Sequence, residues 1–205
     1  MFLNIETRKG AGIMLKDLVL KNRSYRGFDE SYTFTREDLL EYVDLARICS
    51  CAANKQGLKY YIANDKNEVE SLLAHTHFAM ALPELHLPKK GSHPTAFIII
   101  CQDKNIVENA NALQKDIGIV AQTILLAAAE KNLGGLMIGA FDAGKISETA
   151  KLAENLAPML LVALGKPTEK IVLTEVGEDG HTSYYRDAED VHYVPKRKLE
   201  DVIIN

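Results

Sequence analysis

The pattern that most restricts the fold of this chain is a long apolar repeat at residues 106–132. Its apolar residues recur at intervals of three and four, which is the period of a helix. They are Ile106, Ala110, Leu113, Ile117, Val120, Ile124 and Ala128. Between residues 119 and 129 the helix is apolar on nearly all sides, so it must be covered on several faces. Because a helix of about 28 residues is ~42 Å long, we expect a second copy of the chain to supply part of the cover.

Shorter helices and strands are predicted on both sides of this repeat. Amphipathic periods predict helices at residues 14–22, 35–50, 66–82 and 142–156. Strands are predicted at residues 58–64, at the β-rich run 95–101 and at the buried run 158–165, and residues 134–141 are predicted to form a glycine-flanked strand and turn. Thr35 with Asp38 forms a capping-box pattern, and Asp142 is a predicted N-cap.

The order of these elements, with helices first and then strands alternating with helices, predicts a single α+β domain over residues 1–205. Residues 1–13 are expected to be a loose lead-in, and residues 171–205 a polar C-terminal extension. The formal net charge of −4 argues against a protein that binds nucleic acid through bulk positive charge.

The three cysteines are too few for a disulfide scaffold and are typical of the reduced thiols of the cytoplasm. Cys49 and Cys51 have no second pair to complete a zinc site, so we expect no bound metal. No N-terminal segment resembles a secretory signal, and the most apolar window, 117–129, is shorter than the ~20 residues of a membrane span. We therefore expect a cytoplasmic protein that does not contact membranes.

The stretch "NRSYRGF" places two arginines around a small hydroxyl residue, as Arg23, Ser24 and Arg26. Arginine offers a planar fork of donors and serine adds one more, which suits a phosphate group. Taken alone, the stretch also fits a charged helix end that is exposed to solvent.

Two further segments have the composition of a binding site for a flat ligand. In "CSCAANKQG", residues 49–57, small residues allow close approach to the backbone, and Asn54 and Gln56 supply both donors and acceptors. In "GGLMIGAFD", residues 134–142, the small residues leave main-chain N–H groups exposed at a strand end. The alternatives are a helix C-terminus with turn-forming amides and a tight strand–helix turn.

In this order the segments resemble the FMN-dependent nitroreductase family. That family carries an R-x-S-x-[RK] motif, a P-S-x-x-N-x-Q-P-W-like segment, a long central helix, a glycine-rich strand and turn, an L-G-K/Y-P strand end and a basic C-terminal motif. The corresponding stretches here are "NRSYRGF", "SCAANKQGL", "DIGIVAQTILLAAAEKNLGGLMIGAFD", "LVALGKP" and "KRKLEDVI". The resemblance runs from about residue 16 to the end of the chain.

The chain departs from the family pattern at several positions. Asn22 stands where many members have the first arginine, and Cys51 replaces the usual serine. Ser50 replaces the proline, and Gly57 with Leu58 replaces Pro–Trp. The substrate preference of other members therefore does not carry over to this chain.

The resemblance implies a three-layer α/β/α fold with a mostly antiparallel central sheet, a long central helix at a dimer interface, and bound FMN. It implies that Arg23 and Ser24 contact the phosphate, and that Arg26 reaches the phosphate or the N1/O2 edge of the flavin. The C-terminal basic position matches Lys196 and Arg197. The other implied cofactor-binding residues are Ser50, Cys51, Ala53, Asn54 and Gln56 and, through their backbone, Ile138, Gly139 and Ala140.

The implied function is an FMN-dependent NAD(P)H oxidoreductase with ping-pong hydride transfer. NADH or NADPH reduces the flavin at N5, and a nitroaromatic, a quinone or a similar flat small molecule then accepts the hydride. No acidic or basic side chain is required, so no catalytic residue is named. The chain carries no G-x-G-x-x-G turn for a dinucleotide such as FAD. Alternatives are another flavoenzyme of the same fold, for reductive dehalogenation or flavin fragmentation, and a non-catalytic flavin- or phosphate-binding protein.

Overall fold

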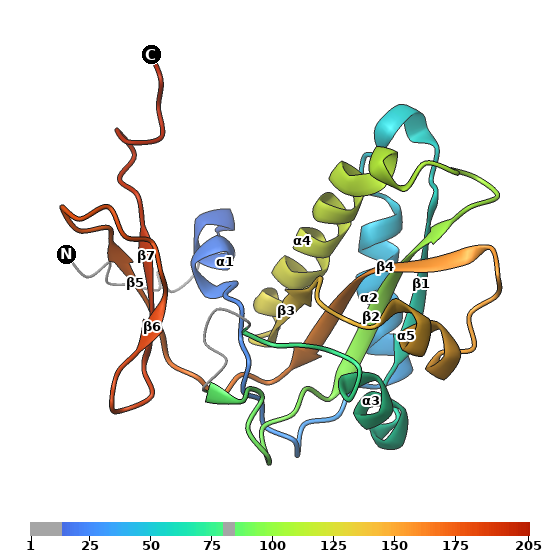
Figure 1. Ribbon diagram of the computed structural model, residues 1–205, viewed down its shortest axis with the longest axis horizontal. Coiled ribbons are helices and arrows are strands. Elements are labelled where there is room, and N and C mark those ends of the chain that lie inside the picture. Colours follow the sequence, from blue (N-terminus) through green and yellow to red (C-terminus); the bar gives the residue numbers. More distant parts are fainter. Residues whose placement is uncertain (1–13, 80–84) are drawn as a thin grey trace.

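A four-stranded antiparallel sheet lies at the centre of the computed structural model, which describes residues 14–79 and 85–205 (Figure 1). The strand order is β1-β2-β4-β3, and every neighbouring pair is antiparallel. The strands are β1 (Leu58–Ala63), β2 (Ala96–Asp103), β3 (Gly134–Ile138) and β4 (Leu156–Gly165). The sheet is therefore antiparallel, as the family resemblance predicts.

Helices cover both faces of this sheet and complete three layers. On one face lie α2 (Arg36–Arg47) and α4 (Gln114–Glu130), and on the other lie α3 (Lys66–Leu73) and α5 (Ala143–Thr149). All eight residues of β2 are buried. Because side chains alternate along a strand, Ile98 packs toward the first face and Ile99 toward the second. The predicted α/β/α architecture is confirmed.

The central helix is shorter than the sequence pattern predicts. Helix α4 begins at Gln114 and is preceded by a 3-10 turn at Ala110–Leu113. Ile106 lies in the turn after β2 and is 44% exposed. The side chain of Asn109 accepts a hydrogen bond from the backbone N–H of Asn111 at 3.0 Å and caps the start of the 3-10 turn. The prediction of helix at residues 106–109 was wrong because this cap begins the helical segment later.

The same helix is covered on most sides within one chain. Ile124 and Ala128 are fully buried, since α4 packs against α2, β3 and β4. The stripe that stays open contains Gly118, Ile119 and Gln122, and Ile119 is 39% exposed. A second copy is therefore not needed to cover most of residues 119–129, contrary to our expectation from the sequence.

The helical segment Ala110–Glu130 is long and apolar enough to cross a membrane, with 21 residues and a mean hydropathy of 1.3 in its most apolar window. This is longer than the window that the sequence indicated. Half of that window is buried inside the fold, as in the core helix of a soluble protein. Its apolar character is accounted for by contacts with the sheet and with α2.

The predicted caps form, and α2, α3 and α5 end earlier than predicted, with α2 ending at Arg47 and not at residue 50. Thr35 and Asp38 form the reciprocal capping box of α2, and the Asp142 side chain caps α5. Helix α3 ends at Leu73 because Thr76 pairs with Phe141 beyond the end of β3. Helix α5 ends at Thr149, and the chain then turns into β4. The lead-in at 1–13 and positions 80–82 of the predicted third helix lie outside the described residues.

The C-terminal extension forms a small sheet that the sequence pattern did not predict. Its strands are β5 (Ile171–Glu175), β6 (Tyr185–Arg186) and β7 (His192–Lys196), in the order β5-β7-β6. In Figure 1 this sheet stands beside α1 (Leu15–Lys21), apart from the central sheet. The strands are short and mostly half exposed, so they lack the apolar runs by which the central strands are recognised.

The burial of α4 leads to a stability prediction. Ala128→Glu places a carboxylate in a fully buried position, and we expect the free energy of unfolding to fall by about 3 kcal/mol or more. Ser71→Glu, at an exposed position of α3, should change it by less than about 0.5 kcal/mol. Urea unfolding followed by circular dichroism measures both. Equal stability of the two variants would show that Ala128 is not in the core of the single chain.

Candidate functional site

The arginine-rich segment leaves α1 and pairs with the free edge of β3. Ser24 forms a parallel bridge with Gly135, and the backbone N–H of Tyr25 donates to the Gly135 carbonyl at 3.1 Å. A Cβ at Gly134 would lie 2.6 Å from the Tyr25 ring, and one at Gly135 would lie 2.0 Å from the Ala163 carbonyl oxygen. These two glycines therefore allow close contact between chain segments. The sequence suggested that their N–H groups are exposed to a ligand, but both residues are buried.

A cavity of about 280 Å³ lies where this segment meets the small C-terminal sheet. The N-terminal side contributes Asn22, Arg23, Ser24 and Arg26, and the C-terminal side contributes Ile171, Tyr184, His192, Val194 and Lys196. Among the described residues that line this cavity, Arg23, Arg26 and Lys196 are cationic and none is acidic. Such a concave, positively charged surface attracts an anion. We call it the arginine cavity.

Both guanidinium groups in the arginine cavity have unsatisfied donors. Arg23 donates from Nη2 to the Val19 carbonyl at 2.6 Å, and Arg26 donates from Nη1 to the Ser24 carbonyl at 3.0 Å. The Nε of each arginine is buried without a hydrogen-bond partner among the described residues. Burial lowers the pKa of both side chains. A bound anion would satisfy these donors and offset the cost of burying them.

Two residues that the sequence analysis did not select, Tyr184 and His192, line the arginine cavity. The guanidinium carbon of Arg26 lies 5.1 Å from the centroid of the Tyr184 ring, a cation–π distance. The Tyr184 ring also meets the His192 ring edge to face, with centroids 5.2 Å apart. Both residues belong to the small sheet and its loop, and the basic C-terminal motif indicated only Lys196 and Arg197 from this part of the chain.

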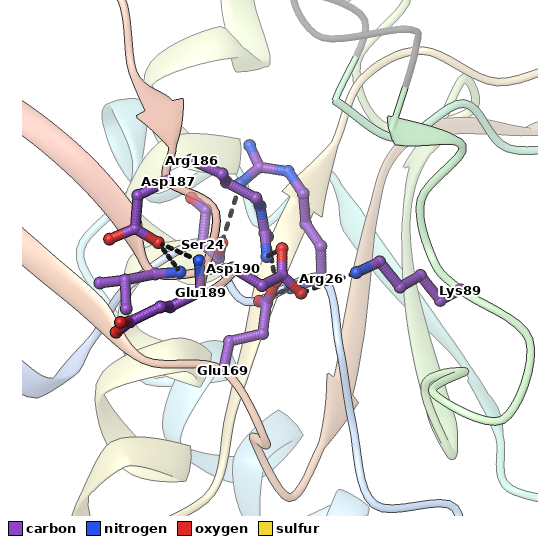
Figure 2. Close-up of polar contacts among 9 residues, drawn as sticks. Ser24, Arg26, Lys89, Glu169, Arg186, Asp187, Glu189 and Asp190 are labelled. Atoms are coloured by element: carbon purple, nitrogen blue, oxygen red, sulfur yellow. Dashed lines mark hydrogen bonds and ion pairs between the residues drawn. The ribbon is translucent and has the colours of Figure 1, made fainter.

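The small sheet is joined to the arginine-rich segment through a buried ion pair (Figure 2). Glu169 accepts hydrogen bonds from the backbone N–H of Arg26 and from the Arg186 side chain. The side chains of Arg186 and Glu169 are only 5% and 7% exposed. Arg186 also pairs with Asp190 at 3.0 Å, and Asp190 pairs with Lys89 at 2.7 Å. This network fixes the backbone at Arg26 and holds β6 close to it.

The second predicted segment forms a strained turn between α2 and β1. Ala53, Asn54 and Gln56 have φ values of 50°, 52° and 52°, in the left-handed region that residues other than glycine seldom adopt. The backbone N–H of Ala52 donates to the Asp116 carboxylate at 3.0 Å, and Asp116 is 3% exposed on α4. Residues held in such conformations often cluster at binding sites.

A second cavity, of about 460 Å³, adjoins this turn. Cys51, Gln56 and Asp116 line it together with Tyr60, whose pKa burial raises to about 12. None of the residues that line it also lines the arginine cavity. Ser50, Ala53 and Asn54 are exposed beside it and line neither cavity. Within one chain, residues 49–57 and the arginines therefore lie at two different cavities among the described residues.

The third predicted segment lies at the far end of β3. The Ile138 side chain is buried, so only its backbone is available. Gly139 is exposed, and a Cβ added there would meet nothing within 4 Å. The Gly135 carbonyl points to the outer edge of β3, where it accepts from Tyr25, and Gly139 directly follows the last residue of this strand. The Ala140 carbonyl is occupied, because it accepts from the His77 N–H at 2.9 Å.

The basic C-terminal residues differ in position. Lys196, at the end of β7, lines the arginine cavity. Arg197 follows it, is exposed and does not line that cavity. The structure thus gathers Arg23, Ser24, Arg26 and Lys196 in one place. Within the part of the chain that the structure describes, no group of three His, Cys, Asp or Glu side chains forms a metal site.

Comparison with known proteins gives the family. The model of the nitroreductase family matches residues 19–166, well over half of the chain. The chain belongs to the nitroreductase family. The match contains the arginine-rich segment, the turn at Ala52–Asn54 and all four central strands, and it ends before the small C-terminal sheet.

Individual relatives are distant. An oxygen-insensitive NADPH nitroreductase from Helicobacter acinonychis is 27% identical over 105 residues, which are 51% of this chain and 43% of that protein. The chain thus matches less than half the length of this curated relative.

Solved structures share the fold. A nitroreductase family protein from Clostridium difficile has a TM-score of 0.62 at 21% identity, over 77% of this chain and 86% of that chain. A protein from Exiguobacterium sibiricum, solved in complex with FMN, has a TM-score of 0.63 at 15% identity, over 77% of this chain and 90% of that chain. Likeness at these identities shows the fold alone.

The buried ion pair leads to a prediction. Glu169→Ala leaves Arg186 buried without its main partner, and we expect the free energy of unfolding to fall by about 3 kcal/mol. Glu189→Ala, at an exposed acidic residue beside the same network, should have little effect. The double variant Glu169→Leu/Arg186→Leu should recover part of the loss, because no charge is then left buried although the backbone N–H of Arg26 still lacks its acceptor. If urea unfolding gives Glu169→Ala and Glu189→Ala the same stability, the pair does not hold the small sheet in place.

Proposed function

We propose that this chain is an FMN-dependent NAD(P)H oxidoreductase of the cytoplasm that reduces nitroaromatics, quinones or similar flat acceptors. The observation that carries the proposal is the arginine cavity, which has three cationic residues, no described acidic residue and two buried Nε atoms without partners. A phosphate monoester provides the charge and the acceptor oxygens that these donors lack. The family of the chain and its FMN-bound structural neighbour support FMN as the source of that phosphate.

In this proposal each group of residues has a separate task. Arg23, Ser24, Arg26 and Lys196 hold the phosphate end of FMN, and the edge of β3 leads from there to the open main chain at Gly139. FMN, when bound, supplies the two-electron chemistry, and the protein contributes position and electrostatics. A positive charge close to the pyrimidine edge of the ring favours the reduced flavin, and Arg26 is the residue proposed for it.

The complete site is proposed to need two copies of the chain. The segment with Ser50, Cys51, Ala53, Asn54 and Gln56 lies at a different cavity from the arginines, so it would reach the flavin of a partner subunit. Asp116 and Val120 of α4 line that second cavity, and Ile119 on the open stripe of α4 lies between them in sequence. A dimer contact on this stripe would therefore bring the partner close to the exposed turn. Arg197 would complete the phosphate site only after such assembly.

Two other functions are compatible with the same fold and are separated from the proposal by experiment. One is a flavoenzyme of the same fold for reductive dehalogenation or flavin fragmentation, and the other is a non-catalytic flavin-binding protein. Addition of NADH or NADPH to the flavin-loaded protein under argon distinguishes a non-catalytic flavin-binding protein from an enzyme. Loss of the flavin absorbance band followed by its return on addition of a quinone supports the proposal. A band that neither nucleotide changes would contradict it.

Cofactor binding can be tested through Arg23. Mass spectrometry of the ligand released by heat should give FMN and not FAD. Arg23→Ala should raise the Kd of the apo-protein for FMN about ten- to a hundredfold, because a charged hydrogen bond contributes about 1.5–3 kcal/mol. Arg36→Ala, at an exposed arginine of α2, is the control and should leave the Kd unchanged. If Arg23→Ala binds FMN as tightly as the control, the arginine cavity is not the phosphate site.

The dimer can be tested on the open stripe of α4. Light scattering of the native protein at micromolar concentration should give twice the mass of one chain. Ile119→Lys changes a residue that is 39% exposed, so the single chain should stay folded while the dimer dissociates and FMN retention falls. Ile119→Val should keep both. A monomeric native protein that retains FMN fully would contradict the two-copy site.

A further inference from the structure

His192 is the most deeply buried polar side chain that lines the arginine cavity, with 2% of its surface exposed. It stands at the first position of β7, where its backbone N–H donates to the Lys170 carbonyl at 2.9 Å. The edge-to-face contact with Tyr184 holds the ring in place. His192 lies outside residues 19–166, the part of the chain that the family model matches.

Both nitrogen atoms of the His192 ring are buried and have no hydrogen-bond partner among the described residues. Polar groups buried in this way are uncommon in native proteins, because each unsatisfied donor or acceptor costs about 1–3 kcal/mol. The Nε atoms of Arg23 and Arg26 are unsatisfied in the same cavity. Arg23, Arg26 and His192 thus each bring an unsatisfied donor to one cavity, and a ligand with acceptor oxygens would pair with these donors.

The ring is uncharged at neutral pH. Burial, together with the nearby cations Arg26 and Arg186, lowers the pKa of His192 to about 4, against the weaker opposing effects of Glu169 and Asp190. An uncharged imidazole has one N–H donor and one acceptor nitrogen. It can therefore donate to a phosphate oxygen without adding a fourth positive charge to a cavity that already holds Arg23, Arg26 and Lys196.

We propose that His192 binds the phosphate end of the ligand in the arginine cavity, as a hydrogen-bond donor supplied by the small C-terminal sheet. This inference rests on the proposed function for the identity of the ligand, a flavin phosphate monoester. The same chemistry would hold inorganic phosphate. In either case Tyr184 and His192 make the small sheet a wall of the binding site, and the Glu169–Arg186 pair keeps that wall against the arginines.

The test uses the full-length apo-protein and compares three ligands. The probes are FMN and riboflavin, followed by quenching of flavin fluorescence, and inorganic phosphate, followed by calorimetry. The proteins are the wild type, His192→Phe, which keeps a ring but removes both nitrogen atoms, and His192→Gln, which keeps a donor. His181→Phe changes an exposed histidine and serves as the matched control.

We expect His192→Phe to raise the Kd for FMN about tenfold and to leave the Kd for riboflavin unchanged, since riboflavin lacks the phosphate. His192→Gln should recover part of the affinity, and His181→Phe should match the wild type. The selective effect on FMN separates a phosphate ligand from a residue that only supports the fold, which would change the affinity for both flavins. An unchanged Kd for FMN, or equal weakening of FMN and riboflavin, would overturn the inference.

The measurement with inorganic phosphate tests the role of His192 separately from the proposed function. If the wild type binds no FMN, the proposed function fails, and inorganic phosphate then decides the role of His192. Weaker phosphate binding by His192→Phe than by His181→Phe would still support it as an anion ligand. Equal binding of phosphate by both variants would overturn it. Circular dichroism of each variant at the assay temperature verifies that the protein is folded.

Discussion

The carboxylate of Glu169 joins the parts of the chain on which the candidate site depends. It accepts from the backbone N–H of Arg26 and from the buried Arg186 side chain, so the arginine-rich segment and the small sheet are fixed to one group. Without this contact, the backbone N–H of Arg26 and the buried Arg186 side chain of β6 would lose the acceptor that they share. The site thus depends on a residue that does not line the arginine cavity itself.

Much of the fold was predictable because local signals and burial agree. The fully buried strand β2 is a continuous β-rich run, and the caps at Thr35 and Asp142 begin their helices where the residue types predict. The sequence also placed Arg23, Ser24 and Arg26 together, and the structure lines one cavity with all three, while their binding of an anion stays a prediction. Lys196 was found through the resemblance and not through any pattern of its own.

The rest depended on contacts between distant segments. The cover of α4 comes from α2 and β3, and no periodicity within α4 shows which of its faces those elements take. The small sheet is made of short, half-exposed strands. Strand β7 therefore has no apolar run by which it could be recognised, and no sequence motif marked His192 as a site residue. The role of Glu169 could not be predicted from the sequence either, because it depends on a contact between distant segments. A glutamate becomes a buried ion-pair partner only when Arg186, 17 residues away, folds against it.

In the proposed dimer, assembly and cofactor binding would reinforce each other. The face of α4 that one chain leaves open is narrow, so its burial alone gives modest stabilisation. The turn that contains Ala53 and Asn54 is held in an unfavourable backbone conformation beside the same helix, anchored by Asp116. A flavin that contacts this turn in one subunit and the arginines in the other would favour the dimer over the separate chains by mass action. The narrow stripe, the strained turn and the unsatisfied arginine donors then have one common explanation, in which the ligand supplies the contacts that neither chain makes alone.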